Sequence, residues 1–169
     1  LNMTGSHDVK RLFSLMLEAS GGDREKAWQL HLAYAAVLFT FPGVPMVYYG
    51  DETCLEGGTD PDNRRPFPWG REDSAMISAF TALARLRREE PVLRRGLFRV
   101  ATPFSDDGNL ANSVFAFERH FANGRDAFDR PLPEHLGTDS VVCVISRSPN
   151  VLTEISLSGF LTGFQYASA

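Results

Sequence analysis

The sequence has few cysteines and no cluster of metal-binding residues. Its 169 residues include two cysteines, Cys54 and Cys143, which lie far apart and belong to no group with metal-ligand spacing. Neither a zinc site nor a disulfide-stabilised scaffold is therefore predicted. We expect both cysteines to be ordinary thiols.

The chain also lacks an excess of positive charge and a long apolar segment. Its formal net charge is −4 and its pI is near 5.5, so no nucleic-acid or anionic-membrane partner is expected. The apolar stretch 32–46 is interrupted by Tyr34, Thr40 and Pro42-Gly43, whereas a membrane helix needs about 20 apolar residues. The sequence opens on Leu1-Asn2 without an initiator Met or a signal peptide, which is typical of the middle of a gene, so the residues themselves predict no compartment.

What the chain does contain is typical of a folded protein in two parts. Hydrophobic residues make up 43% of it and aromatic residues 11%, which excludes disorder of the whole chain. The pattern changes near residue 97, from helical spacing to short alternating segments. We predict an α/β part over 1–96 and an all-β domain over 97–169.

The first part is predicted to alternate helices with a strand. Apolar residues recur at helical spacing over 9–18, and Asp23 is a candidate N-cap for a second helix that ends at Pro42-Gly43. The uncharged, β-branched and aromatic run 44–49 predicts a strand buried on both faces. A helix, a short turn and a buried strand form the grammar of a parallel α/β fold.

A long loop and a third helix follow. Residues 50–73 are rich in Gly, Pro and charge, and a loop of that length after a strand is typical of a functional site. Residues 74–90 predict a helix that Pro91 closes. The all-β part is predicted to contain strands at 98–100, 113–119, 141–145 and 152–157, with polar turns at 106–109 and 122–124.

Polar residues that could carry chemistry occur in two places near strand ends. His7-Asp8 precedes the first helix, where Asp8 could equally be a capping residue. Asp51 and Glu52 follow the strand directly, which is where ligands bind in parallel α/β proteins. Carboxylates at such a position can also serve only to anchor a loop through backbone hydrogen bonds.

The loop 57–69 has the residue types that hold a neutral sugar. Asp and Arg side chains form paired hydrogen bonds with adjacent hydroxyls, and aromatic faces cover the C–H side of the ring. The alternative is an exposed ion-pair network of Asp60, Arg64 and Arg65, worth about 0–1 kcal/mol per pair. Composition alone does not decide between the two.

Together these segments resemble the α-amylase family of glycoside hydrolases. Residues 2–8, NMTGSHD, resemble that family's fourth conserved region, at the end of the seventh barrel strand. Residues 39–52 resemble its seventh helix end and eighth strand, and residues 83–96 its last barrel helix and the exit into a β domain. The loop 57–69 is similar to that of the neopullulanase, cyclomaltodextrinase and maltogenic amylase subgroup.

The resemblance covers residues 2–98 and is weak beyond them. It implies the C-terminal portion of a TIM barrel, strands 7–8 and their helices, over 1–96. A small antiparallel β-sandwich domain is implied over 97–169, although its tail 159–169 has no counterpart to the last strands and leaves truncation or divergence open.

The resemblance also implies roles for individual residues. Asp8 matches the transition-state-stabilising aspartate, and His7 the histidine that bonds the sugar at the cleavage subsite. Asp60 and Arg64 match the loop pair that holds a neighbouring glucose. Substrate binding is further implied, on weaker matches, for three residues: Arg11, Tyr49 and Glu52.

The implied activity belongs to a longer parent enzyme. In the family, the nucleophilic Asp and the acid/base Glu lie on the fourth and fifth strands, before the segments matched here. We therefore expect a fragment of a retaining α-glucan hydrolase or transglycosylase that is inactive alone. The expected substrates are α-1,4-linked malto-oligosaccharides or cyclodextrins, with α-1,6 linkages left open. No cofactor or metal site is expected in this chain, calcium and homodimerisation stay open for the full-length parent, and the subgroup resemblance favours the cytoplasm.

Two other classes of function fit the sequence less well. A non-catalytic carbohydrate-binding β module over 97–169 would need a row of exposed aromatic residues, but Trp28 and Trp69 lie earlier and Tyr166 stands alone. A His-Asp metal phosphohydrolase would need further ligands near His7-Asp8, and the remaining histidines lack ligand spacing.

Overall fold

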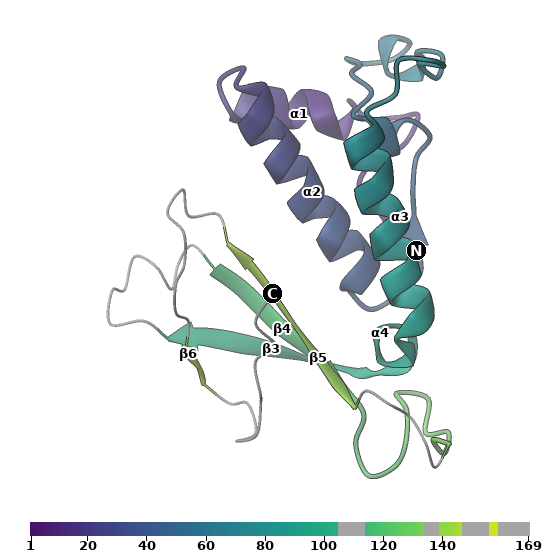
Figure 1. Cartoon of the computed structure of the whole chain (residues 1–169), viewed down its shortest axis with the longest axis vertical. Coiled ribbons are helices and arrows are strands. Elements are labelled where there is room, and N and C mark those ends of the chain that lie inside the picture. The colour runs from purple at the N-terminus through teal and green to yellow at the C-terminus, as the bar shows by residue number, and fades with distance from the viewer. Residues whose placement is uncertain (105–113, 134–138, 147–155, 159–169) are drawn as a thin grey trace. The chain divides into compact units, whose positions relative to one another are not determined.

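The computed structural model describes residues 1–104, 114–133, 139–146 and 156–158 (Figure 1). The chain divides into two compact units, Leu1–Arg94 and Arg95–Ala169. The boundary predicted from the sequence lies at residue 96, and the identities assigned to the two parts stay predictions.

Two helices of the first unit are capped by aspartates, of which Asp23 was predicted as an N-cap and Asp73 was not. Helix α1 spans Leu12–Ala19, and α2 spans Arg24–Thr40, with the Asp23 carboxylate accepting from the Lys26 amide at 3.1 Å. Helix α3 spans Ser74–Glu89 and is capped in the same way by Asp73, at 2.9 Å from the Met76 amide. The predicted helices are confirmed, although α1 starts at Leu12 rather than at residue 9. Helix α1 begins after Arg11, so Asp8 does not cap it.

A short helix that was not predicted from the sequence begins at Pro91. This helix, α4, spans Pro91–Arg95. The proline closes α3 as predicted and also opens α4, because its fixed φ suits the first helical position.

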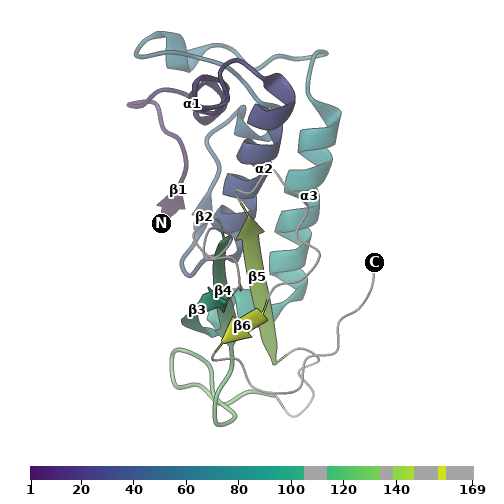
Figure 2. The same ribbon diagram turned by 90° about the vertical axis from the view of Figure 1, so that its left-hand side faces the viewer.

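Two short parallel strands join the N-terminal segment to the segment after α2. Strand β1, Asn2–Met3, pairs with β2, Pro45–Met46, in the register Asn2 with Pro45 and Met3 with Met46 (Figure 2). The parallel pair with α2 in its connection confirms the predicted α/β grammar.

The prediction of a strand over 44–49 that is buried on both faces was wrong in extent and in burial. Strand β2 covers only Pro45–Met46, and Val44 and Val47 are 61% and 37% exposed. In the described part of the chain this sheet has two strands, so too little structure covers β2 to bury both of its faces.

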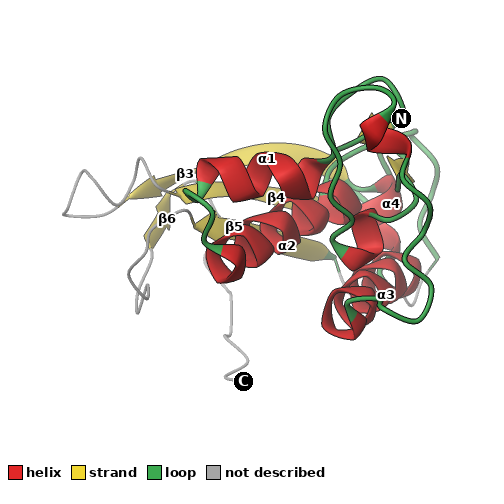
Figure 3. Ribbon diagram, turned by 90° about the horizontal axis from the view of Figure 1, so that it is seen from above, coloured by secondary structure: helices red, strands yellow, loops and turns green. Residues whose placement is uncertain are grey.

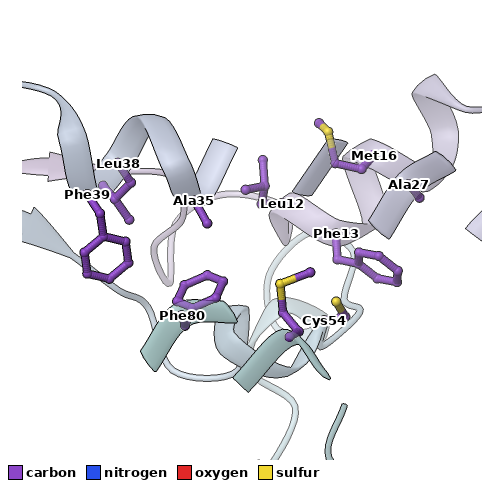
Figure 4. Close-up of a cluster of buried hydrophobic side chains, with 10 residues drawn as sticks. Leu12, Phe13, Met16, Ala27, Ala35, Leu38, Phe39, Cys54 and Phe80 are labelled. Carbon is purple, nitrogen blue, oxygen red and sulfur yellow. The ribbon is translucent and has the colours of Figure 1, made fainter. Parts of the chain in front are cut away.

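The core of the first unit lies where α1, α2 and α3 meet. Apolar side chains from the three helices interlock there (Figure 4). The fully or nearly fully buried members are Leu12, Phe13 and Met16 of α1, Ala27, Ala35, Leu38 and Phe39 of α2, and Met76 and Phe80 of α3. Their burial holds the three helices together, and the segments before α1 and before α3 carry the predicted site residues.

The predicted long loop over 50–73 connects β2 to α3 (Figure 3). It contains two single-turn 3₁₀ helices, η1 over Asp51–Thr53 and η2 over Asp62–Arg64. A backbone hydrogen bond connects the loop to the start of α1, in which the Arg11 amide donates to the Gly57 carbonyl at 3.2 Å. The loop is therefore ordered by the rest of the unit rather than by long elements of its own.

The described residues of the second unit form an antiparallel sheet in the order β5-β4-β3-β6. Its strands are β3 over Leu97–Phe104, β4 over Val114–His120, β5 over Ser140–Ser146 and β6 over Ser156–Ser158. The strands predicted at 98–100, 113–119 and 141–145 are confirmed, and so is the turn at 122–124, where Asn123 and Gly124 have positive φ.

Several expectations for this unit fall outside what the structure describes. They concern the turn at 106–109, the start of the strand predicted at 152–157 and the tail 159–169. The second sheet of a β-sandwich stays a prediction, since the described residues of this unit form a single sheet.

Candidate functional site

The predicted site segments meet through the side chain of Asn63. This side chain is fully buried, and its Nδ2 donates to the His7 carbonyl at 2.8 Å and to the Val9 carbonyl at 3.0 Å. Asp8 lies between these two acceptors, and Arg64 directly follows Asn63 in the chain. The loop of Arg64 is thus hydrogen-bonded to the segment that carries His7 and Asp8.

Arg11 makes the reverse connection from the start of α1. Its Nε donates to the Asn63 carbonyl at 2.7 Å and its Nη1 donates to the Tyr49 carbonyl. The guanidinium carbon lies 4.1 Å from the ring centroid of Tyr48 and 4.5 Å from that of Tyr49. Because the residue is 1% exposed, its burial does not support the direct substrate contact predicted from the sequence.

The four residues with the most specific predicted roles form two exposed pairs. His7 Nε2 lies 3.2 Å from Asp8 Oδ1, and these side chains are 61% and 72% exposed. Arg64 Nε lies 2.8 Å from Asp60 Oδ1. Both pairs therefore present polar groups to solvent, where hydroxyl groups of a ligand could bind.

Tyr49 and Glu52 are tied into the loop that carries them. The Tyr49 hydroxyl donates to the Arg65 carbonyl at 2.9 Å while 39% of the residue stays exposed. Glu52 accepts from the Gly50 amide at 2.8 Å through Oε2. For Glu52 this is the loop-anchoring arrangement, and a substrate contact stays a prediction for both residues.

Asp51 is a buried carboxyl directly beneath the site. It is 2% exposed, and neither side-chain oxygen has a hydrogen-bond partner among the described residues. Burial raises the pKa of Asp51 to about 7, against the smaller opposing effect of the Arg11 charge. A Cβ added at Gly5 would lie 3.2 Å from Asp51 Oδ2, so the carboxyl packs against the segment that leads to His7 and Asp8.

His31 of α2 is buried in the core and contacts the backbone of Asp51. Its Nε2 lies 2.7 Å from the Asp51 carbonyl oxygen, which can only accept, so Nε2 is the protonated nitrogen. Its ring packs edge-on against Phe13 at a centroid distance of 5.6 Å. Burial lowers the pKa of His31, which favours the neutral ring.

The described residues contain no group of three or more His, Cys, Asp or Glu side chains that could hold a metal ion. The prediction that this chain needs no cofactor or metal stays a prediction. Within the same residues, no helix has both the length and the apolar character required to cross a bilayer. Cys54 is a buried free thiol, as predicted, and burial raises its pKa to about 12. Cys143 lies half-buried in β5.

The sequence did not indicate that Asn63 and Arg11 hold the two segments together. Asn63 lies inside a charged, proline-bearing run, where an asparagine is usually a turn residue. Only its complete burial and its contacts across 56 and 54 positions of sequence reveal the connection. No periodicity or spacing in the sequence carries that information.

Known proteins resemble the chain in both sequence and structure. The amylopullulanase of Thermoanaerobacter thermohydrosulfuricus is 36% identical over 152 residues, which is 86% of this chain and 10% of that protein. Neopullulanase 2 of Thermoactinomyces vulgaris is 37% identical over 102 residues, 58% of this chain and 16% of that protein. The chain therefore spans a small share of the length of these relatives.

The chain is also similar to a solved structure of a sugar hydrolase. The cyclic α-maltosyl-(1→6)-maltose hydrolase of Arthrobacter globiformis, solved with that sugar, superposes with a TM-score of 0.54 at 33% identity, covering 72% of this chain and 24% of that one. Its likeness fits a fragment of the TIM-barrel fold of α-amylase-type enzymes.

The family model of the α-amylase catalytic domain matches residues 1–92. This match includes both exposed pairs, Asn63 and Arg11. More than half of the 169 residues lie within it, and the named relatives fit a neopullulanase-like subgroup. This protein belongs to the α-amylase family.

Proposed function

We propose that this chain forms part of the sugar-binding face of a retaining α-glucan hydrolase or transglycosylase that acts on α-1,4-linked glucose. The observation that carries the proposal is the pair of hydrogen bonds from Asn63 to the His7 and Val9 carbonyls, which joins the two polar segments. The Arthrobacter relative hydrolyses a cyclic sugar with a (1→6) bond, so α-1,6 linkages stay within the proposed substrate class.

Asp8 is proposed to stabilise the transition state of glycosidic cleavage. Retaining cleavage passes through an oxocarbenium-like state, in which positive charge develops as the ring flattens. A carboxylate bonded to ring hydroxyls can tighten its contacts at that moment. His7 Nε2, 3.2 Å from Asp8 Oδ1, would orient this carboxylate, and its other ring nitrogen would hydrogen-bond a sugar hydroxyl.

Asp60 and Arg64 are proposed to hold a neighbouring glucose. A carboxylate and a guanidinium side by side offer an acceptor and several donors at the spacing of adjacent hydroxyls. Their ion pair is half-exposed, so it contributes about 0–1 kcal/mol to stability and can be reoriented at small cost toward a ligand.

The nucleophile and the acid/base are proposed to come from outside these residues, as the family resemblance implies. We therefore expect no release of glucose or maltose when the purified chain is incubated with maltotriose or α-cyclodextrin. Turnover that disappears in an Asp8→Asn variant would refute this part of the proposal.

Sugar binding tests the remaining part, and the loop offers a matched control. Arg64 pairs with Asp60, whereas its neighbour Arg65 pairs with Asp62 at 2.7 Å, and both arginines are about half exposed. We expect maltotriose to shift the NMR signals of His7, Asp8, Asp60 and Arg64, with a dissociation constant on the order of 1 mM. Arg64→Ala should weaken binding at least about fivefold and Arg65→Ala less than about twofold. Equal losses in the two variants would contradict the assigned site.

A further inference from the structure

We infer that Arg11 and Asn63 form a reciprocal clamp that fixes the His7-Asp8 segment against the Asp60–Arg64 loop in the arrangement a sugar needs. In this role both are positioning residues and neither touches the sugar. The inference deepens the proposed function and rests on it.

Each of the two side chains donates hydrogen bonds to backbone carbonyls of the segment that carries the other residue. Asn63 donates to the carbonyls of His7 and Val9, on either side of Asp8. Arg11 donates to the carbonyl of Asn63, immediately before Arg64, and to that of Tyr49. Two carbonyl oxygens facing one carboxamide require its NH₂ group on that side, so the direction of these bonds is determined. Three of these hydrogen bonds thus cross between the loop and the segment that begins α1, and the fourth ties Arg11 to Tyr49, directly before the loop.

The exposed pairs do not themselves join the two segments. Asp8 is paired with its neighbour His7, and Arg64 is paired with Asp60 within the loop. The distance between Asp8 and Arg64 therefore depends on the backbone beneath them. That backbone is held by two side chains that are 1% and 0% exposed, which screens their hydrogen bonds from water.

Gly57 provides separate evidence that the clamp needs close packing. A Cβ at this position would lie 2.6 Å from the Asp62 carbonyl oxygen, 2.9 Å from Asn63 Cα and 3.0 Å from Arg11 Cγ. Two of these atoms are backbone, so they cannot move aside without shifting the loop. The Gly57 carbonyl also accepts from the Arg11 amide at 3.2 Å, so the absence of a side chain lets the two halves of the clamp meet.

Three variants of the full chain separate the clamp from general stability. Asn63→Asp keeps the shape but replaces the amide donor with an acceptor, and Arg11→Lys keeps the charge but loses the guanidinium fork. Gly57→Ala removes no donor, but its added methyl group would push the loop backbone away from Arg11. Gln29→Ala is the control, because it removes an exposed carboxamide of α2 that bonds only to the exposed side chain of Glu25 among its described partners.

Two readouts are measured on each variant. The first is hydrogen exchange without sugar, comparing the Arg11 amide, bonded to Gly57, with the amides of α2. The second is maltotriose binding by NMR titration. We expect the clamp variants to speed exchange at Arg11 at least about tenfold more than in α2 and to weaken maltotriose at least about fivefold. The double variant of Arg11→Lys and Asn63→Asp should weaken binding little more than the worse single variant, because the two residues act as one unit.

The outcomes distinguish the clamp from the proposed function. If exchange rises equally at Arg11 and throughout α2, or if the clamp variants bind maltotriose as the wild type does, the clamp is overturned while the sugar site stands. A wild-type chain in which maltotriose shifts none of the His7, Asp8, Asp60 and Arg64 signals overturns the proposed function, and with it the role of the clamp in sugar binding.

Discussion

The guanidinium of Arg11 lies 3.9 Å from the carboxyl of Asp51, with both side chains withdrawn from solvent. The contact is too long for a hydrogen bond, and in the part of the chain that the structure describes neither carboxyl oxygen has another partner. Arg11 directs its donors to backbone carbonyls instead, as described above. The charge of Asp51 is therefore poorly compensated, which explains why burial outweighs the nearby cation and raises its pKa to about 7.

The first prediction concerns the pH dependence of stability. Between about pH 4 and pH 7 the folded chain holds a proton on Asp51 that the unfolded chain, with a pKa of 3.8, has released. The stability that this group contributes is complete below about pH 4 and is lost as pH rises through about 7. We expect the free energy of unfolding of Asp51→Asn, minus that of the wild type, to rise by on the order of 2–4 kcal/mol from pH 4 to pH 8.

Urea unfolding followed by circular dichroism at 222 nm measures this difference. Asp62→Asn is the control, because Arg65 lowers the pKa of Asp62 and its titration lies at more acidic pH. The corresponding difference for this variant should stay flat between pH 4 and pH 8. An Asp51→Asn difference that is equally flat would show that the Asp51 carboxyl is ionised throughout this range.

The second prediction concerns Arg87, which supports the C-terminal end of α2. Its Nη1 donates to the carbonyls of Phe39 at 2.7 Å and Leu93 at 3.0 Å, and its Nη2 donates to that of Gly43. Arg87→Met should lower the free energy of unfolding by about 2–4 kcal/mol, because buried carbonyls lose a charged donor. The neighbouring Arg88→Met should change it by less than about 0.5 kcal/mol, since the Arg88 side chain is 74% exposed. Similar losses in thermal unfolding of both variants would show that the Arg87 bonds contribute little.

The third prediction compares the two capping aspartates. Asp23 accepts only from the Lys26 amide among its described side-chain bonds, whereas Asp73 accepts from the Met76 amide and from Trp28 Nε1, at 3.0 Å. Asp23→Ala should cost about 1 kcal/mol and Asp73→Ala about 2–3 kcal/mol, because the indole also loses its acceptor. Trp28→Phe isolates the indole bond, and in the Asp73→Ala background its cost should shrink. Chemical denaturation of the four variants measures this, and equal costs for the two aspartates would contradict it.

The helices could be read from the sequence because their signals are local. Asp23 and Asp73 mark helix starts through their own side chains, and Pro91 marks an end through its ring. The strand at 44–49 was over-read, because its composition suits a buried strand while its burial depends on neighbours elsewhere. Individual residues in the motifs also gave the exposed pairs, His7 with Asp8 and Asp60 with Arg64, as a candidate site.

The sequence by itself determined the family, the order of the longer elements and the residue types proposed to bind a sugar, because these are encoded in short motifs and in local periodicity. The tertiary structure alone decided that Arg11 is buried, that Asn63 reaches across to the backbone around Asp8, and that burial raises the pKa of Asp51 to about 7. The physical reason is that burial and long-range hydrogen bonds depend on which distant segments pack together. That arrangement appears only when the chain has folded.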